Sequence, residues 1–505
     1  MRQFARLTDE EIDIDLLNRT YSGRGSRPHR PDLLLKLVLY EHSQGRPQPV
    51  QWFEDLKDSR AVQWLVWGLR PSQTTLYEFR DRVQPLLQKL NQQVIRTAIG
   101  EGHTDGSQGA LDGTTVAANA SRHRLLKRET VEERLNQLQQ EIAKAEAAKD
   151  APPSLEIQAR DEPLAAGTAL SPGAEPTGVE TARPSFLGKT LRAMKRQRAQ
   201  YLRARAVLHD RHQANGRRRK DKRKKSEQIR VAIGDPLAPF GLDKLKTYRP
   251  LYNIQTMSDV GTDLVLAYAT TRTTTDSGQL VPMLDLTKRV TGRRLRDVLV
   301  DAGYPRGDER ARCAEREVII YAPWNENSRT EAKRAKGKGK GRDQIPKDRF
   351  TFDPSIPGYR CPQGKVLKYR NRNVMQKASG EYFPVEIYQA EPTDCAGCPL
   401  KAHCVRGRTG ARTVRRQEHQ VLIDALRARM DTPEAKRKYR DRCCTVERRF
   451  ADLKTHRGLQ RFSGQTPERA DAQVGLTVLA HNLLTLDKLR ARRKLQHENP
   501  AKMAC

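Results

Sequence analysis

Five strand-like segments and one helical segment follow one another in an order that constrains the fold of this chain. The strand-like segments are short and apolar and lie at residues 109–118, 252–257, 264–269, 297–301 and 317–323. The helical segment, at 277–290, separates the third strand from the fourth, and a helix around Glu447 follows much later. Strands and helices in this order predict an α/β fold, with a mixed sheet flanked by helices.

The first strand carries an acidic residue at a position where an apolar one is expected. Asp112 lies between Leu111 and Gly113, and we expect the Asp-Gly pair to interrupt the strand. An unpaired carboxylate in a buried strand is costly, and a bound metal ion would compensate its charge. The alternative is an ordinary Asp-Gly hairpin turn, which the same pair also favours.

Two further acidic residues lie where a metal site of three carboxylates needs them. Asp301 ends the fourth strand, before Gly303, and strand ends are where α/β sheets present their chemistry. Glu447 lies on a predicted helix whose Val446, Phe450 and Leu453 form an apolar stripe.

Lys454 follows Glu447 by seven residues, about two helical turns, so we expect both on one face of that helix. This spacing suits a metal ligand beside a phosphate-binding ammonium group. The alternative is a surface helix whose charges face water.

The charge of the chain indicates a polyanionic partner. It has 94 Lys and Arg against 61 Asp and Glu among 505 residues, a net charge of +33. Nucleic acid is the simplest partner for such an excess. A membrane surface is the alternative, but we find no long apolar run and no signal peptide. We therefore expect a soluble cytoplasmic protein, associated with the nucleoid, with the basic runs 217–225 and 333–342 contacting phosphates.

The pattern along the chain predicts several parts. A helical, DNA-binding part is expected first, and the sheet of the core is expected to be interrupted by a basic insertion with helices around Leu135 and at 187–212. A flexible linker, 147–183, is expected between these two helices. The expected ranges are 1–105 for the helical part, 106–330 for the first part of the core with its insertion at 119–245, 331–435 for a basic loop and Cys-rich insert, 436–490 for the last core helices, and 491–505 for a basic tail.

The cysteines cluster, which favours metal binding over a disulfide framework. Cys395 and Cys398 form a Cys-x2-Cys pair, Cys404 follows closely, and Cys361 precedes them. Four thiolates hold zinc tetrahedrally, so we predict one structural zinc ion there, with His403 as a substitute for one ligand. Reduced free thiols in a Cys-rich loop are the alternative.

Three of these stretches together resemble the DDE transposases of bacterial insertion sequences. The segment Leu111-Asp-Gly-Thr-Thr-Val-Ala-Ala-Asn-Ala-Ser is similar to the strand of the family's first Asp, and Val300-Asp-Ala-Gly-Tyr to that of the second. Thr445-Val-Glu-Arg-Arg-Phe-Ala-Asp-Leu-Lys is similar to the family's acidic helix, with its Glu-x6-Lys spacing. The segment Tyr252-Asn-Ile-Gln, the N-terminal helices and the Cys cluster also have counterparts in the family.

The resemblance implies a ribonuclease-H-like fold and a metal-dependent transfer of DNA strands. It implies two Mg²⁺ (or Mn²⁺) ions held by Asp112, Asp301 and Glu447, with Lys454 on a phosphate near the cleaved end. The implied partner is double-stranded DNA, as transposon ends and as target, bound by a homodimer. A nuclease that cuts without strand transfer, and a non-catalytic DNA-binding protein on the same fold, are the alternatives.

One departure from the family concerns the last helix. The family signature is Tyr-x2-Arg-x3-Glu-x6-Lys, and Tyr439-x2-Arg442 fits it. Four residues, however, separate Arg442 from Glu447. The resemblance implies DNA-binding roles for Tyr439, Arg442 and Lys454. Only Lys454 keeps the family's spacing to Glu447, so the roles of Tyr439 and Arg442 are in doubt.

Overall fold

The computed structural model divides the chain into two compact units. The first comprises Met1–Arg122, Arg217–Arg223 and Leu237–Cys505, and the second comprises His123–Gly216 and Lys224–Pro236. Most of the expected linker and the whole basic run 333–342 lie outside the described residues. The structure describes residues 1–21, 23, 28–150, 186–243, 246–306, 308–323, 345, 347–377, 380–405 and 410–498.

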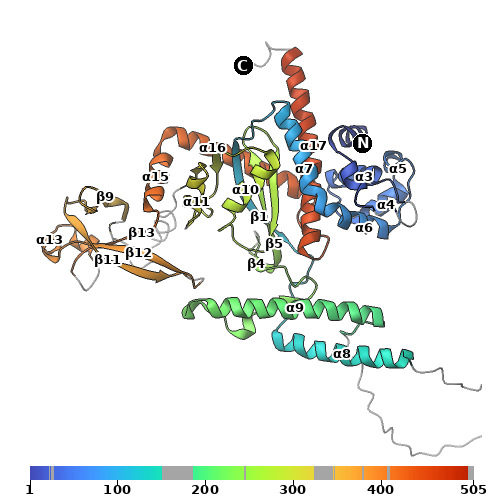
Figure 1. Cartoon of the computed structure of the whole chain (residues 1–505), viewed down its shortest axis with the longest axis horizontal. Helices are drawn as coiled ribbons and strands as arrows, with labels where there is room; N and C mark the ends of the chain where they lie inside the picture. The colour runs from blue at the N-terminus through green and yellow to red at the C-terminus, as the bar shows by residue number, and fades with distance from the viewer. Residues whose placement is uncertain are drawn as a thin grey trace, which may run out of the picture. The chain divides into compact units, whose positions relative to one another are not determined.

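The first unit is built around a six-stranded mixed sheet (Figure 1). Its strands are β1 Gln108–Ala117, β4 Phe240–Leu242, β5 Tyr248–Asp259, β6 Val265–Thr271, β7 Asp297–Leu299 and β8 Ile319–Tyr321. They lie in the order β4-β5-β1-β7-β8, and β6 pairs with β5. The pairs of β5 with β1, β4 and β6 are antiparallel, whereas β1–β7 and β7–β8 are parallel. The predicted mixed sheet is therefore confirmed.

The expected interruption of the first strand is wrong, and so is the alternative of a hairpin turn. Strand β1 is continuous, with Asp112 opposite Thr256 and Gly113 opposite Gln255. The Asp-Gly pair does not break it because β5 supplies a partner for each residue of β1 from 109 to 117. Glycine is required at 113 for space, since a Cβ there would lie 2.2 Å from Asp276 Oδ1.

The fourth expected strand is shorter than the sequence indicated. Strand β7 ends at Leu299, and the Val300 amide still donates to the Tyr321 carbonyl at 2.9 Å. Asp301 lies beyond it, in a turn that is closed by the Tyr304 amide donating to the Asp301 carbonyl at 3.0 Å. The carboxylate thus stands on the loop after the strand and not on the strand itself.

The N-terminal helices share one buried core with the sheet. Residues of α3, β7 and α17 such as Leu35, Val298 and Leu479 belong to the same buried cluster, whereas we expected a separate part at 1–105. Helix α17 also extends into the expected basic tail. The helices are α1 Arg2–Glu11, α2 Asp15–Asn18, α3 Pro31–Ser43, α4 Pro49–Asp58, α5 Arg60–Leu65, α6 Gln73–Val83, α7 Leu87–Gly100, α10 Leu280–Thr291, α11 Glu309–Glu315, α15 Gln420–Asp431, α16 Pro433–Ala451 and α17 Pro467–Glu498.

A second, five-stranded sheet in the first unit was not foreseen from the sequence. It contains antiparallel strands in the order β13-β12-β11-β10-β9, in the Cys-rich region. The elements of this region are β9 Thr351–Asp353, β10 Gly358–Arg360, β11 Val366–Gln376, β12 Tyr382–Gln389, α13 Pro392–Ala396, α14 Lys401–Cys404 and β13 Thr413–Gln417. Short 3₁₀ turns occur at η1 Gln84–Leu86, η2 Lys220–Lys222, η3 Ser226–Gln228 and η4 Lys347–Arg349.

The second unit contains two long helices. They are α8 Arg128–Asp150 and α9 Leu191–Arg217, and a short pair of strands, β2 Leu125–Leu126 and β3 Val231–Ala232, completes the unit. Leu135, Leu138 and Ile142 are buried against residues of α9, so the predicted amphipathic helix is confirmed. We expected the insertion at 119–245, but residues 240–242 form β4 and pair with β5. Among the described residues, no helix is both long and apolar enough to span a membrane.

Candidate catalytic site

Asp112 is half-buried near the middle of the central sheet and faces an arginine of α16. Arg442 Nη2 lies 3.1 Å from Asp112 Oδ1, and Arg442 Nε is buried without a hydrogen-bond partner among the described residues. Loss of solvent raises the pKa of Asp112, and Arg442 and the Gly113 amide lower it in part. The charges of Asp276 and Asp301 raise this pKa further. Several carboxylates therefore act on one another at this point of the sheet.

Asp301 reaches this place through the parallel pairing of β1 and β7. The two strands pair only from 108 to 110 and from 297 to 299, and both run toward the same edge of the sheet. Asp301 is exposed just beyond that pairing, and its charge acts on Asp112. The structure thus brings together the first two carboxylates that the sequence singled out.

Asp276 is a third carboxylate at this place, and sequence reasoning missed it. It lies in the loop between β6 and α10, where its Oδ1 accepts hydrogen bonds from Asn253 Nδ2 at 2.9 Å and from Gln255 Nε2 at 2.8 Å. No motif or spacing in the sequence links this loop to Asp112. The one available signal is an acidic residue directly ahead of a predicted helix, and this more often indicates a helix start.

Tyr304 fixes the orientation of the Gln255 amide. Its buried hydroxyl donates to Gln255 Oε1 at 2.5 Å, so that Gln255 Nε2 faces Asp276. Burial, then the charges of Asp276 and Asp112, raise the pKa of Tyr304 far above its ordinary value. The hydroxyl therefore keeps its proton and remains a donor.

Glu447 lies on α16, as predicted, but its side chain is exposed. The apolar stripe of that helix is confirmed, because Val446, Phe450 and Leu453 are buried. Glu447 follows Arg442 by five positions, a rotation of about 140° around an α-helix. Glu447 therefore leaves the helix at a different angle from Arg442, the residue that contacts Asp112. Within the described residues, no group of three or more His, Cys, Asp or Glu side chains is arranged to hold a metal ion.

Lys454 and Tyr439 contact the backbone of the sheet. Lys454 Nζ donates to the Thr115 carbonyl of β1 at 3.2 Å, and the Tyr439 hydroxyl donates to the Val300 carbonyl at 3.3 Å. Lys454 belongs to a π-helical turn, Asp452–His456, in which hydrogen bonds span five residues. The angle expected from an α-helix between Glu447 and Lys454 therefore does not apply.

Ion pairs hold α16 and the π-helical turn in place. Lys438 Nζ lies 2.6 Å from Asp297 Oδ2 at the start of β7. Asp452 Oδ2 contacts His481 Nδ1 of α17 at 2.9 Å and Arg457 Nε at 2.7 Å. These contacts orient the helix that carries Arg442 and Glu447 against the sheet.

The four cysteines of the predicted zinc site gather at one end of the second sheet. Cys395 and Cys404 are buried in one cluster, Cys361 packs against it, and none of the four forms a disulfide. Burial raises the pKa of Cys404, Arg412 lowers it, and the other three cysteines raise it. The four thiols thus lie close enough to act on one another electrostatically. His403 is exposed.

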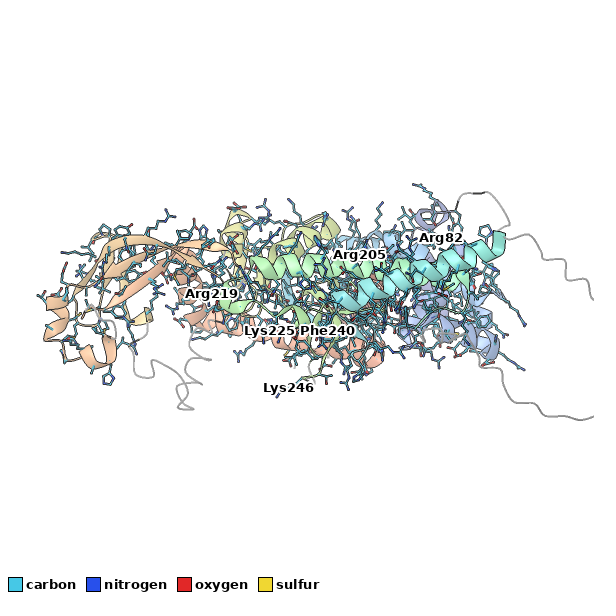
Figure 2. All side chains as sticks on the ribbon, turned by 90° about the horizontal axis from the view of Figure 1, so that it is seen from below. Arg82, Arg205, Arg219, Lys225, Phe240 and Lys246 are labelled. Carbon is cyan, nitrogen blue, oxygen red and sulfur yellow. The ribbon has the colours of Figure 1, made fainter. Side chains whose placement is uncertain are left out.

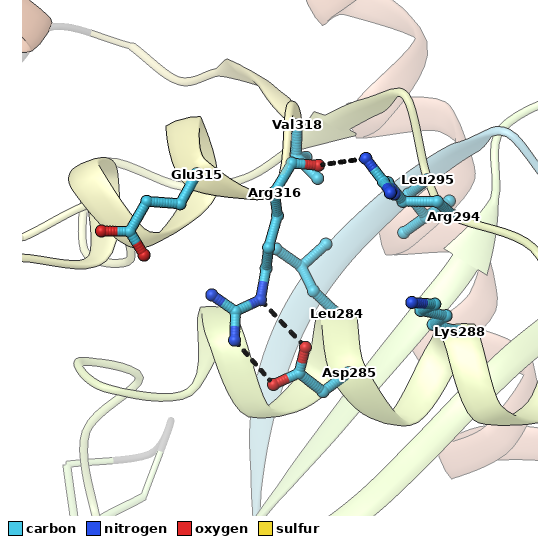
Figure 3. A pocket seen from close by; sticks show the side chains of 8 residues that line it. All are labelled: Leu284, Asp285, Lys288, Arg294, Leu295, Glu315, Arg316 and Val318. Carbon is cyan, nitrogen blue, oxygen red and sulfur yellow. Dashed lines mark hydrogen bonds and ion pairs between the residues drawn. The ribbon is translucent and has the colours of Figure 1, made fainter.

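A pocket of about 320 Å³ lies in the same unit but away from the carboxylates (Figure 3). Within it, Arg316 Nε and Nη2 bind both oxygens of Asp285, at 3.0 and 3.1 Å. Arg294 reaches the Arg316 carbonyl at 3.5 Å. Both arginines therefore bind groups of the chain within this pocket, which Lys288 also lines.

Comparisons with known proteins identify two regions of the chain. Residues 360–486 match a family described as a transposase DDE domain, a span that includes the four cysteines, Glu447 and Lys454. Residues 1–82 match a second family, described as a transposase domain (DUF772). No curated protein and no solved structure matches the chain.

Proposed function

We propose that the chain is a DDE transposase of an insertion sequence, which cleaves DNA at the ends of such an element and joins those ends to a target. Its matches to two transposase families support this proposal. The observation that carries the proposal is the placement of Asp112 and Asp301 at adjacent parallel strands, with α16 against them. The strand order β4-β5-β1-β7-β8, with β6 on β5, supports a ribonuclease-H-like core.

The donor groups of this site suit magnesium or manganese. Mg²⁺ prefers a few carboxylates, water and phosphate oxygens, and Asp112 is a half-buried carboxylate whose charge is only partly balanced by Arg442. We propose that Asp112, Asp301 and Glu447 hold two such ions. When bound, paired divalent ions activate the attacking oxygen and stabilise the leaving oxygen of an in-line displacement.

The residues of the chain orient the DNA and neutralise its charge in this proposal. Arg442 balances Asp112 before DNA arrives and is close enough to contact a phosphate there. Lys454 supplies a compact ammonium group for the cleaved end. Both transposon ends and target are double-stranded DNA, which we propose is bound by a homodimer in the cytoplasm, at the nucleoid.

A cleavage and joining assay tests the proposal, with DNA that ends in the inverted repeats flanking the coding DNA. Purified protein is incubated with a labelled duplex that ends in such a repeat, a target plasmid and Mg²⁺, and nicked and joined products are measured. Wild-type protein should give both products, whereas Asp112→Asn, Asp301→Asn and Glu447→Gln should each abolish both and retain DNA binding. Near wild-type cleavage by one variant would remove that residue from the proposed site.

The same assay separates the alternatives. A nuclease on this fold gives nicked DNA without joined product, and a non-catalytic protein binds the duplex without cutting it. Asp285→Asn is a suitable control, because Asp285 pairs with Arg316 in the pocket described above.

We also propose that Cys361, Cys395, Cys398 and Cys404 bind one structural zinc ion. The proximity of the four thiols supports this, because the other three act on Cys404 electrostatically and zinc takes four thiolates. Metal analysis of protein purified without any chelator should give about one zinc ion per chain. The double variant Cys395→Ser, Cys398→Ser should contain no zinc. A zinc content near zero would contradict the proposal.

A further inference from the structure

We propose that Asp276 is a further metal-binding carboxylate of this site, and that Asn253 contributes its amide oxygen to the same cation. The inference rests on the proposed function and adds two residues to it. It is carried by the hydrogen bonds of Asp276 with β5, by its closeness to Gly113 of β1, and by a buried oxygen of Asn253 that has no hydrogen-bond partner among the described residues.

Asp276 is held in place by two amide groups of the sheet. Asn253 Nδ2 and Gln255 Nε2 both donate to its Oδ1, and the Tyr304 hydroxyl fixes which end of the Gln255 amide faces it. Asn253, Gln255 and Tyr304 are each at most 1% exposed. A carboxylate held by buried donors is in a defined position, as a metal ligand must be.

The absence of a side chain at Gly113 lets Asp276 reach the strand of Asp112. A Cβ at 113 would lie 2.2 Å from Asp276 Oδ1, closer than any side chain is tolerated. The pairing of β7 with β1 ends at Ala110, ahead of Asp112 and Gly113. The charge of Asp276 acts on Asp112, together with that of Asp301, so the three carboxylates are near one another beyond the end of this pairing.

Asn253 supplies an observation that is independent of the acidic groups. Its side chain is 1% exposed and donates to Asp276, yet its Oδ1 has no hydrogen-bond partner among the described residues. A Cβ at Gly113 would lie 3.1 Å from this oxygen, so the oxygen faces the same space. A buried acceptor without a donor is costly. A cation satisfies it, because carbonyl and carboxylate oxygens are the ligands that hard divalent cations take.

Binding of Mn²⁺ alone, without DNA, tests the inference apart from catalysis. The full-length protein is titrated with Mn²⁺, and free Mn²⁺ is followed by electron paramagnetic resonance. Asp276→Asn keeps the shape of the side chain and an acceptor for both amides, so the fold should be retained. We expect its dissociation constant for Mn²⁺ to rise about tenfold or more, and that of Asn253→Ala to rise as well.

Asp285→Asn is the matched control, since Asp285 is an ion-paired carboxylate on the neighbouring helix α10. It should leave Mn²⁺ binding unchanged, and circular dichroism should show all variants folded. Equal Mn²⁺ affinity of Asp276→Asn and wild type, with loss of binding in Asp112→Asn, would overturn this inference and leave the proposed function standing. No Mn²⁺ binding by wild-type protein would overturn both.

Discussion

Lys454 connects the end of the α16 segment to the first strand, three residues beyond Asp112. Its ammonium group donates to the Thr115 carbonyl, and a DNA strand that leaves the site would pass this point. We expect Lys454→Ala to weaken binding of pre-cut terminal DNA about tenfold, since a charge-assisted hydrogen bond contributes about 1.5 kcal/mol or more. Lys454→Arg should recover part of that loss, because the charge is kept.

Fluorescence anisotropy at one fixed salt concentration measures the affinity of each variant for pre-cut terminal DNA. Cleavage rates are measured in parallel. Lys436→Ala removes an exposed charge at the other end of α16 and is the control. Cleavage by Lys454→Ala should slow by less than that by Asp112→Asn. If Lys454 only supports the fold, its loss lowers the melting temperature and leaves the DNA affinity of the folded protein unchanged.

At the scale of single residues, the sequence predicted Asp112 and Asp301 because each is an acidic residue in or at the end of an apolar segment, and because each lies in a motif that resembles the family. Asp276 could not be predicted in this way, because its place depends on a loop that folds back over β5 and on the space left by Gly113. The direction of Glu447 could have been questioned from the sequence, since five residues of helix turn it away from Arg442.

Three arginines lie together on one exposed face of α9. Arg192, Arg196 and Arg203 are exposed within an arc of about 40°, and have no ion-pair partner in the described part of the chain. Met194, Tyr201 and Leu208 bury the opposite face. Figure 2 shows Arg205 on the same helix, and Arg219 and Lys225 on the basic run that follows it. The run 217–225 is exposed along its whole length.

We expect this face to bind DNA phosphates without reading sequence. Each phosphate contact contributes about 0.9 to the slope of log affinity against log salt. Changing Arg192, Arg196 and Arg203 together to Gln should therefore lower the slope by up to about 2.7 units and weaken all sequences alike. Binding is measured between 50 and 200 mM salt, the range over which such slopes are resolved.

A matched variant separates the effect of this face on the salt slope from the effect of the protein's net charge. Lys488, Arg492 and Lys494 are exposed on α17, and their joint change to Gln removes the same charge. The control should change the slope less. Equal slopes for wild type and the α9 variant would show that the arginines are only solvated surface. Neutralising 217–225 should flatten the slope in the same way.

The elements were predictable where burial leaves an apolar pattern. The central strands are buried and were found, whereas most of β11 is exposed and leaves no such pattern. The sheet of the Cys-rich region was therefore missed, although its cysteines were noticed. Strand β4 was missed for a related reason, since only one of its three residues is buried.

At the scale of the whole molecule, the shared core decides how the parts unfold. The N-terminal helices, the six-stranded sheet and α17 contribute to one buried cluster, so we expect these elements to unfold together. The sequence indicated a boundary near residue 105 because the pattern changes there from helix to strand. A change of pattern does not reveal which apolar faces pack together.

Glu41 makes the stability of this shared core depend on pH. It is fully buried on α3, and loss of solvent, followed by the neighbouring Asp55, raises its pKa from 4.5 to about 8, while Arg46 opposes the shift. The folded protein therefore keeps a proton on Glu41 that the unfolded chain releases above about pH 4.5. Because the folded state binds more protons in this range, stability falls as pH rises from about 4.5 to 8.

The variant Glu41→Gln isolates this contribution, because glutamine has the shape of the protonated side chain and does not titrate. Its stability should match that of wild type near pH 5 and exceed it increasingly toward pH 8, by at most about 1.4 kcal/mol per pH unit. Urea unfolding at several pH values measures the difference, with Glu10→Gln on the exposed face of α1 as control. Parallel curves for wild type and Glu41→Gln would mean that Glu41 is ionised in the folded protein, with Arg46 balancing its charge.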